Sequence, residues 1–313
     1  MILITGATGF VGKALLQRLL ADNDKSHRFV VAVRNATLLW PEQVLPIETG
    51  DMDPLTDWSI ALAGVTVVVH SAARVHVMQD TVSDPLTSFR YVNVDGTLNL
   101  ARQAAAAGVK RFVFISSVKV NGESTPLGCA FDSDSFNPQD AYGQSKHEAE
   151  LGLRQVGADT GMNVVIIRSP LVYGPGVKAN FAALKRLVLS GWPLPLGAVH
   201  NLRSLVALDN LVDFIEICIT HPKAVNQTFL VSDGQDLSTT ELVRSMAQAA
   251  GVSVRLLPVP VWALQAVASL LGKGDVAKRL CGNLQIDISK ARRILGWVPP
   301  VSVQEGLRRA MAV

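Results

Sequence analysis

Two residues that can move a proton together, Tyr142 and Lys146, lie four positions apart in the chain. On a helix this spacing brings both side chains to one face, one turn apart. An ordinary tyrosine has a pKa of about 10, and lowering it to about 7 takes roughly 4 kcal/mol. An ammonium group at about 4 Å in an effective dielectric of about 20 supplies roughly this amount. We therefore predict that Lys146 lowers the pKa of Tyr142 and that the phenol exchanges a proton with a substrate oxygen. The alternative is an ordinary exposed helix.

The elements that must position this pair alternate regularly along the first half of the chain. Short apolar runs rich in β-branched residues are typical of buried strands, and helix-like stretches lie between them. The alternation predicts an α/β fold with a Rossmann-like, doubly wound parallel sheet. The expected strands cover residues 1–5, 28–34, 65–70, 111–116 and 163–168, and the expected helices cover about 10–22, 55–63, 85–107 and 140–157.

Three glycines follow the first expected strand and open the first helix. Their spacing permits a tight turn and a close approach of the backbone to a pyrophosphate. The amino-terminal end of the helix then faces the phosphate charge. We predict that this loop binds a dinucleotide, whereas the alternative is a turn that only packs the helix on the sheet. The loop residues expected at the cofactor are Gly6, Thr8, Gly9, Phe10, Val11 and Gly12.

The ends of the next strands indicate which dinucleotide binds. NAD-binding folds usually carry an acidic residue after the second strand, but this chain has Arg34, which suits a 2′-phosphate. We therefore expect NADP in preference to NAD; the alternative is that Arg34 stacks on adenine and NAD is accepted. Asp51 and Met52, after the third strand, are expected at the adenine, unless Asp51 only forms a turn. Ala72 and Ala73, after the fourth strand, are small enough to let the backbone approach the cofactor.

Composition excludes several classes of protein. The chain has 313 residues, of which 49% are hydrophobic and 18% charged, as expected for a folded soluble enzyme. A net charge of +3 gives no reason to expect nucleic acid as a partner. Cys129, Cys218 and Cys281 form neither a zinc pattern nor a disulfide framework, so we expect reduced thiols, no metal and a cytoplasmic protein. We expect no signal peptide, and the most apolar stretch, 259–271, is too short for a transmembrane segment, which takes about 20 residues.

The regular alternation ends near residue 170, where glycine and proline become frequent. We therefore expect a dinucleotide-binding domain over residues 1–170 and a smaller α/β substrate lobe over residues 171–313. Segments of the two can interleave.

Several motifs, taken together, resemble the extended short-chain dehydrogenase/reductase family, also described as the NAD-dependent epimerase/dehydratase family. They are the glycine loop at 5–12, the serine pair at 116–117 and the Tyr142 and Lys146 pair. Residues 172–176, 203–209, 287–291 and 295–297 resemble later segments of the same family, so the likeness covers the whole chain. The family is dominated by nucleotide-sugar epimerases, dehydratases and reductases.

The resemblance implies a role for each matching residue. Tyr142 gives a proton to the C4 oxygen of a sugar as hydride arrives from the nicotinamide. Lys146 binds the nicotinamide ribose, and Ser117 hydrogen-bonds the same sugar oxygen. Asn93 supports the site or is, alternatively, a structural residue. The other positions expected at the cofactor are Pro170 and Val172.

The substrate end of the site is expected from positions where relatives hold a nucleotide diphosphate. Asn180 is expected as a hydrogen-bond partner and Arg203 as a pyrophosphate ligand, unless Arg203 forms a structural ion pair with Asp209. Lys119 is expected to face the sugar, or else to be a solvated surface lysine. Arg279 is a further phosphate candidate.

Residues 117–123 carry a narrower resemblance, to a branch linked to bacterial surface polysaccharides such as the O-antigen. That branch reduces UDP-4-keto-6-deoxy-N-acetylglucosamine at C4 toward UDP-N-acetylquinovosamine. Asn121 stands where most relatives have tyrosine, and Leu171 stands where many epimerases have asparagine. The resemblance thus predicts an NAD(P)-dependent UDP-sugar reductase. The alternatives are a UDP-sugar 4-epimerase that retains NAD and a non-catalytic dinucleotide-binding regulatory protein. Relatives pair through helices that correspond to 85–107 and 140–157, so a homodimer is expected.

Overall fold

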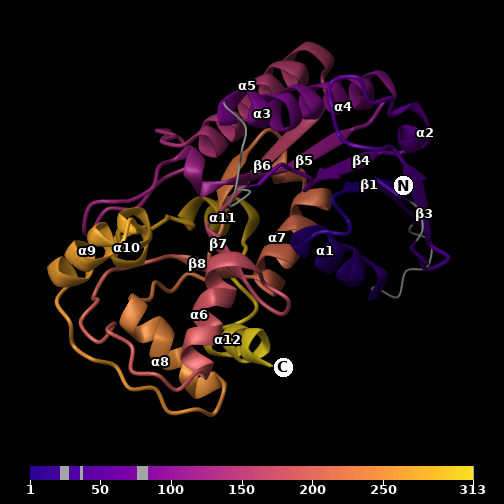
Figure 1. Ribbon diagram of the computed structural model, residues 1–313. Coiled ribbons are helices and arrows are strands. Elements are labelled where there is room, and N and C mark those ends of the chain that lie inside the picture. Colours follow the sequence, from indigo (N-terminus) through magenta and orange to yellow (C-terminus); the bar gives the residue numbers. More distant parts are fainter. Residues whose placement is uncertain (22–27, 36–37, 76–83, 313) are drawn as a thin grey trace.

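A parallel sheet forms the centre of the protein. The structure, a computed structural model, describes residues 1–21, 28–35, 38–75 and 84–312. Within these ranges the main sheet has seven strands in the order β3-β2-β1-β4-β5-β6-β9 (Figure 1). The strands are β1 (Ile2–Thr5), β2 (Phe29–Val33), β3 (Val44–Glu48), β4 (Val67–His70), β5 (Arg111–Ser117), β6 (Asn163–Ser169) and β9 (Thr228–Leu230). All of them run parallel, as the apolar runs in the sequence predict.

Successive residues of each strand face opposite layers of helices. Ile4, Val31 and Val69 belong to one core, while Leu3 and Val30 belong to the other. The first core packs against α1 (Phe10–Ala21), α7 (Leu208–Thr220) and α11 (Ser289–Leu295); the second packs against α2 (Ser59–Leu62), α4 (Thr97–Ala106) and α5 (Ala141–Thr160). Figure 1 shows these two layers on either side of the sheet. The prediction of a doubly wound, Rossmann-like sheet is confirmed.

The single helix expected over 85–107 is instead three successive elements. They are α3 (Pro85–Phe89), a π-helical segment η1 (Arg90–Gly96) and α4. The π-helical turns widen the helix where Asn93 directs its buried side chain toward Arg74 and Ser145. Helical periodicity alone does not reveal such a segment, because the hydrophobic pattern continues through it.

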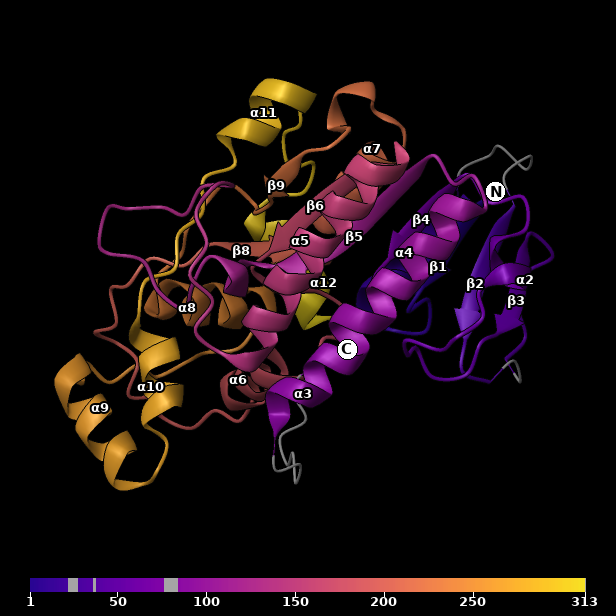
Figure 2. The same ribbon diagram turned by 90° about the horizontal axis from the view of Figure 1, so that it is seen from above.

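A second, smaller sheet and several helices form the other lobe. β7 (Leu171–Tyr173) pairs in parallel with β8 (Leu205–Ala207). A third core joins these strands to α6 (Ala179–Leu189), α8 (Thr239–Ala249) and α12 (Val303–Met311). The helices α9 (Val261–Leu270) and α10 (Gly274–Cys281) lie together at the edge of this lobe (Figure 2). Two short 3-10 turns, η2 (Val118–Val120) and η3 (Pro222–Ala224), complete the described elements.

The C-terminal half of the chain also contributes to the main sheet. β9 pairs with β6 through Ile166, Ile167 and Arg168, and it forms the edge of the seven-stranded sheet. α7 packs beside α1, where Arg18 bonds to Glu216 at 3.1 Å. Residues 205–230 therefore pass from the small sheet back to the large one. Whether 1–170 and 171–313 act as separate domains stays a prediction.

Candidate active site

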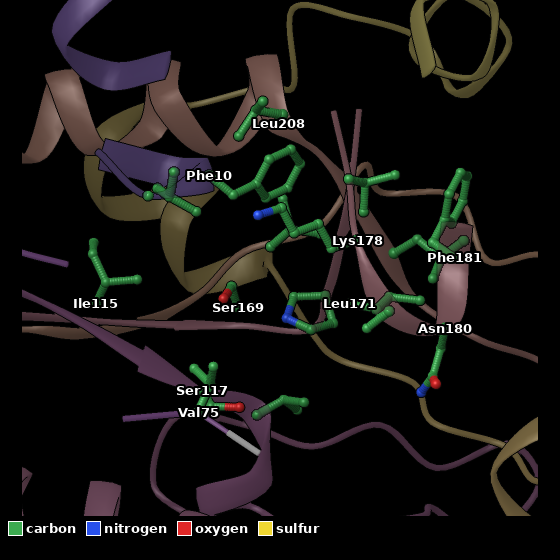
Figure 3. A pocket seen from close by; sticks show the side chains of 18 of the residues that line it. Phe10, Val75, Ile115, Ser117, Ser169, Leu171, Lys178, Asn180, Phe181 and Leu208 are labelled. Carbon is green, nitrogen blue, oxygen red and sulfur yellow. The ribbon is translucent and has the colours of Figure 1, made fainter. Parts of the chain in front are cut away.

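A cleft of about 1420 Å³ lies at the carboxyl ends of the central strands, between the two lobes. Ligands of open α/β sheets bind at this edge. The volume exceeds the roughly 300–1,000 Å³ of a site for one small molecule, so a dinucleotide and a second ligand fit together. Figure 3 looks into the cleft: Phe10 and Leu208 lie on one side, Ser117 lies opposite them, and Asn180 lies toward one end.

The glycine loop forms a tight cradle at the start of α1. Gly9 N–H donates to the Gly6 carbonyl at 2.8 Å, and Gly6 has a φ of +70°, which favours glycine. A Cβ atom on Gly12 would lie 2.3 Å from the Gly6 oxygen, so only glycine fits there. Thr8, Gly9, Phe10 and Val11 line the cleft, with the amino-terminal end of α1 toward it. This exposed backbone at a helix N-terminus suits the pyrophosphate of a dinucleotide.

The ends of β2 and β3 place Arg34 beside Asp51. Arg34 Nη1 lies 3.8 Å from Asp51 Oδ1, and the two side chains are 81% and 85% exposed. The guanidinium predicted to hold a 2′-phosphate therefore has a carboxylate beside it. Met52 packs partly against the second core, which leaves Asp51 as the more accessible of the two residues expected at adenine.

The loop after β4 is held by hydrogen bonds from β1. Ser71 Oγ donates to the Thr5 carbonyl at 2.7 Å, and Ala72 N–H donates to Thr5 Oγ1 at 3.3 Å. Ala73 lines the cleft, whereas Ala72 lies against the Gly6 backbone. His70 is fully buried between Thr5 and Thr97, and burial, aided by the charge of Lys146, lowers its pKa to about 3. His70 is therefore neutral at pH 7 and acts as a packing residue.

Asn93 is 1% exposed and acts as a brace behind the site. Its Oδ1 accepts from Arg74 N–H at 2.8 Å, and its Nδ2 donates to the Arg74 carbonyl at 3.0 Å and to Ser145 Oγ at 3.1 Å. The side chain thus joins the loop after β4 to α5, one residue from Lys146. These contacts match the structural alternative for Asn93.

Ser117, Tyr142 and Lys146 line the same cleft from two adjoining elements. Ser117 ends β5, and Tyr142 and Lys146 lie on the first turns of α5, which Asp140 caps by accepting from Gly143 N–H at 2.7 Å. Lys146 Nζ donates to the Ile115 carbonyl at 2.9 Å and lies 4.4 Å from the centre of the Phe114 ring. Of the three tyrosines, Tyr91 and Tyr173 do not line the cleft.

The prediction that Lys146 lowers the pKa of Tyr142 is wrong for this structure. Burial, with a contribution from the Asp140 carboxylate, raises the pKa of Tyr142 to about 12. Burial also lowers the pKa of Lys146 to about 7, and Glu150 acts in the opposite direction. Both groups lose solvation, and this effect exceeds the attraction that the four-residue spacing suggests. Tyr142 is therefore a protonated phenol at pH 7, able to donate a proton.

We predict that the protein becomes more stable as the pH rises from about 7 toward 10, because of Lys146. The unfolded chain holds the lysine proton up to its usual pKa of 10.5, whereas the folded state releases it near 7. Below pH 7 the buried lysine destabilises the folded protein by its full amount. Between pH 7 and 10.5 this effect is lost, and the free energy of unfolding rises by at most about 1.4 kcal/mol per pH unit. Urea unfolding without added nucleotide should show this slope.

The comparison that isolates this effect is with Lys146→Met, measured at pH 7, 8.5 and 9.5. The difference in unfolding free energy between the wild type and this variant cancels the contributions of all other titrating groups. One of these is Cys218, whose raised pKa lowers the stability of the folded protein as the pH rises above 9. Equal pH slopes in the two proteins would contradict the lowered pKa of Lys146.

A buried ion pair lies beneath the reacting residues. Glu150 Oε2 accepts from Arg168 Nη2 at 2.7 Å, with Arg168 Nε at 3.0 Å from Oε1, and the two side chains are 0% and 2% exposed. Glu150 also accepts from Ser116 Oγ at 2.6 Å, beside Ser117. Arg168 Nη1 donates to the Ser135 carbonyl at 2.9 Å. The pair therefore joins α5, β5, β6 and the loop that contains Ser135.

The same loop engages Asn121, which is 1% exposed. Its Nδ2 donates to the carbonyls of Asp132 and Ser135, each at 2.8 Å. Asn121 therefore has a structural role and does not line the cleft. Leu171 lines the cleft with Pro170 and Val172.

The residues predicted at the substrate end lie in one cleft but make different contacts. Lys119 bonds to Glu123 at 2.8 Å and to Asp140, so its charge is partly neutralised. Arg203 donates to the carbonyls of Arg279 and Gly282 at 2.5 and 3.0 Å.

The predicted alternative for Arg203 was an ion pair with Asp209. In the structure Asp209 pairs with Arg309 at 3.3 Å. Asn180 and the Arg279 side chain are exposed in the cleft wall.

Sequence reasoning missed two features of the site. Lys178, at the amino-terminal boundary of α6, lines the cleft and is suited to an anionic group (Figure 3). Its signal was a lysine two residues after the Gly-Pro-Gly sequence at 174–176 and directly before a helix. The Glu150 and Arg168 pair had no local signal, because the partners are 18 positions apart on different elements.

Comparison with known proteins gives the family. Residues 2–232 match the NAD dependent epimerase/dehydratase family. The chain belongs to this family. The protein is therefore an NAD-dependent enzyme of the epimerase/dehydratase type.

The chain is 52% identical over 312 residues to the UDP-glucose 4-epimerase of Vibrio cholerae, covering 98% of this chain and 93% of that one. It is 28% identical to the N-acetyl-alpha-D-glucosaminyl-diphospho-ditrans,octacis-undecaprenol 4-epimerase of Escherichia coli O157:H7, over 99% of this chain and 94% of the relative. The UDP-glucuronic acid 4-epimerase of Bacillus cereus, solved with NAD, superposes with a TM-score of 0.78 at 22% identity, over 99% and 97% of the chains. The Bordetella bronchiseptica enzyme WbmG, solved with NAD and UDP, has a TM-score of 0.75 at 21% identity, over 99% and 93%. These two structures support the fold.

Proposed function

We propose that this protein is a UDP-hexose 4-epimerase that retains NAD. The observation that carries the proposal is the single cleft in which Ser117, Tyr142 and Lys146 face the glycine loop of α1. The substrate class comes from the Vibrio cholerae relative, with which the chain shares 52% identity. Bound NAD supplies the chemistry of taking a hydride from C4 and returning it.

The chain's own residues handle the proton at the sugar oxygen. Tyr142 Oη would have to be a phenolate to take the proton of the C4 hydroxyl, a form that the positive charge of a bound oxidised nicotinamide would favour. The resulting phenol returns the proton to the C4 oxygen when hydride comes back, and Ser117 Oγ donates a hydrogen bond to the same oxygen. Lys146 Nζ donates to the Ile115 carbonyl, so its position is set by β5 and needs no substrate. Arg203 and Lys178 are placed to neutralise the nucleotide phosphates.

A second candidate is the C4 reductase of a UDP-4-keto-6-deoxy-HexNAc, in surface-polysaccharide synthesis. Leu171 favours it, because this residue is 41% exposed in the cleft wall at the position where many epimerases have asparagine. An apolar group there suits a sugar that lacks its 6-hydroxyl.

The two candidates differ in what happens to the nicotinamide. Purified enzyme is incubated with UDP-glucose, UDP-galactose and their N-acetyl forms, and separately with the keto-sugar and NADH. An epimer mixture with no net change in nicotinamide absorbance supports the epimerase. Stoichiometric loss of NADH absorbance with the keto-sugar, and no epimerisation, supports the reductase. If neither reaction occurs and NAD still binds, a non-catalytic role follows.

We propose NAD as the cofactor, and we withdraw the expected preference for NADP. Structural neighbours were solved with NAD, and the Asp51 carboxylate 3.8 Å from Arg34 would oppose a 2′-phosphate. Fluorescence titration should give a Kd for NADH about tenfold below that for NADPH. Asp51→Asn should bring the two Kd values closer together, because it removes the carboxylate that repels a 2′-phosphate. Tighter binding of NADPH by the wild-type protein would contradict the proposal.

The assembly and compartment are also proposals. We propose a homodimer through α4 and α5, where Leu151 is 51% exposed; light scattering that gives the mass of one chain would overturn it. The three cysteines are free, which suits a reducing, cytoplasmic setting. Within the described ranges, no helix combines the length and apolarity needed to cross a bilayer.

A further inference from the structure

α9 is unusual among the longer helices because none of its residues is buried. Its outer side consists of Trp262, Ala266, Val267, Leu270 and the adjoining Leu271, which we call the α9 face. Trp262 is 73% exposed, Val267 57%, Leu270 87% and Leu271 69%. The inner side of the helix, Val261 and Leu264, packs partly against the third core. The helix is thus held to the fold while its outer side presents large apolar groups to solvent. Soluble surfaces rarely gather such groups without a partner.

Basic residues flank this apolar stretch in the sequence, and Lys273 closely follows the helix. No charged residue occurs from 256 to 272, whereas Arg255 precedes this stretch, and Lys273 and Lys278 follow it. All three are exposed, and Asp275 is the one acidic residue between 251 and 286. No ion pair involving these three basic residues occurs within the described part of the chain. The charge around α9 is therefore positive and available to an anionic partner.

The face adjoins the active-site cleft. α10 packs on α9, and its Val276 and Arg279 line the cleft. Figures 1 and 2 place both helices together at the far edge of the small lobe, away from α4 and α5, where the dimer is proposed. A partner at the α9 face therefore meets the protein beside the cleft and leaves the proposed dimer surface free.

We propose that the α9 face docks on the anionic surface of a phospholipid membrane. A tryptophan and leucines on one side of a helix, bordered by lysine and arginine, match a helix that lies in the plane of the interface. Trp262 suits the headgroup level, since its ring is apolar and its N–H is polar. The basic border suits anionic headgroups. A symmetric contact between two copies would instead gather Lys273 and Lys278 of both copies at one interface, which like charges oppose.

Vesicle co-sedimentation of the full chain tests this proposal. We expect binding to vesicles of phosphatidylglycerol and phosphatidylethanolamine, weaker binding to phosphatidylcholine, and a loss of binding at high salt. Leu270→Glu should weaken partitioning at least about tenfold, because it puts a charge in the apolar face. The matched control is Leu55→Glu, which changes a leucine 85% exposed. Leu55 falls between β3 and α2 in the chain, and these two elements lie at the opposite end of the molecule from α9 (Figure 2). The control should therefore bind as the wild type does.

Tryptophan fluorescence provides a second readout. Brominated lipid should quench the emission of the wild-type protein and should quench Trp262→Phe much less. Activity of Leu270→Glu on a soluble nucleotide sugar should stay unchanged, which separates this proposal from the proposed function. Absence of vesicle binding overturns the proposal. So does equal weakening by both glutamate variants, or a change of oligomeric state in Leu270→Glu with vesicle binding retained.

Discussion

Tyr142→Phe is expected to lower kcat by about 10²- to 10⁴-fold, the usual contribution of a positioned acid or base. The phenylalanine ring retains the edge-to-face contact with Phe89, whose centroid lies 5.9 Å away, so the fold should be unaffected. Burial raises the pKa of Tyr142 to about 12, but the variant has no hydroxyl to titrate at any pH. The variant therefore lacks the donor itself, and a change of pH should not restore activity.

Tyr91→Phe is the matched control for this substitution. Tyr91 is 46% exposed on η1 and does not line the cleft, so the same loss of a hydroxyl should leave kcat unchanged. Steady-state kinetics and NADH titration on both variants measure turnover and binding separately. Tyr142→Phe should bind NADH normally, and unchanged turnover in that variant would remove Tyr142 from the mechanism.

Arg168→Met is expected to cost about 3–5 kcal/mol in unfolding free energy, the usual effect of removing one partner of a buried ion pair. The Glu150 carboxyl group, which has no exposure, would then retain only Ser116 Oγ at 2.6 Å and the partly exposed Arg154 at 3.5 Å. The carbonyls of Ser133 and Ser135 would lose their donor as well. Urea unfolding monitored by circular dichroism measures this change in unfolding free energy.

Two further variants test whether the cost comes from the unpaired charge. Glu150→Leu combined with Arg168→Met should recover part of the loss, because neither partner of the pair is then left without the other. Arg308→Met removes an arginine whose side chain is 67% exposed and which pairs with Glu305. It should shift the midpoint of urea unfolding little, because exposed ion pairs contribute little to stability. If Arg168→Met cost no more than Arg308→Met, the buried pair would not hold the site together.

The order of strands and helices was predictable because parallel strands, buried on both faces, appear as short apolar runs. Ile2–Thr5 and Arg111–Ser117 have this form, and both are strands. The turn at Gly6 was predictable for a different reason, since a left-handed φ followed by a helix calls for glycine.

Other features depend on contacts between distant positions. The pKa of Tyr142 depends on burial by the surrounding fold, which the spacing to Lys146 does not report. The pairing of Arg168 with Glu150 needs the packing of β6 on α5. The apolar run at 228–231 indicates a strand, but not that this strand pairs with β6, because the two segments are far apart in the chain. Arg34 beside Asp51 follows from the parallel pairing of β2 with β3, and is visible only once that pairing is known.

The return of residues 228–230 to the edge of β6 has a consequence for synthesis on the ribosome. Until β9 has emerged, β6 presents an unpaired edge, and the apolar face that α7 covers is open to other nascent chains. At about 5–20 residues per second, the sixty residues after 170 take roughly 3–12 s to make. We expect ribosome-bound chains arrested near residue 200 to be cleaved readily by protease, and chains arrested well beyond 270 to resist. Resistance of the shorter chains would show that the first six strands fold without the seventh.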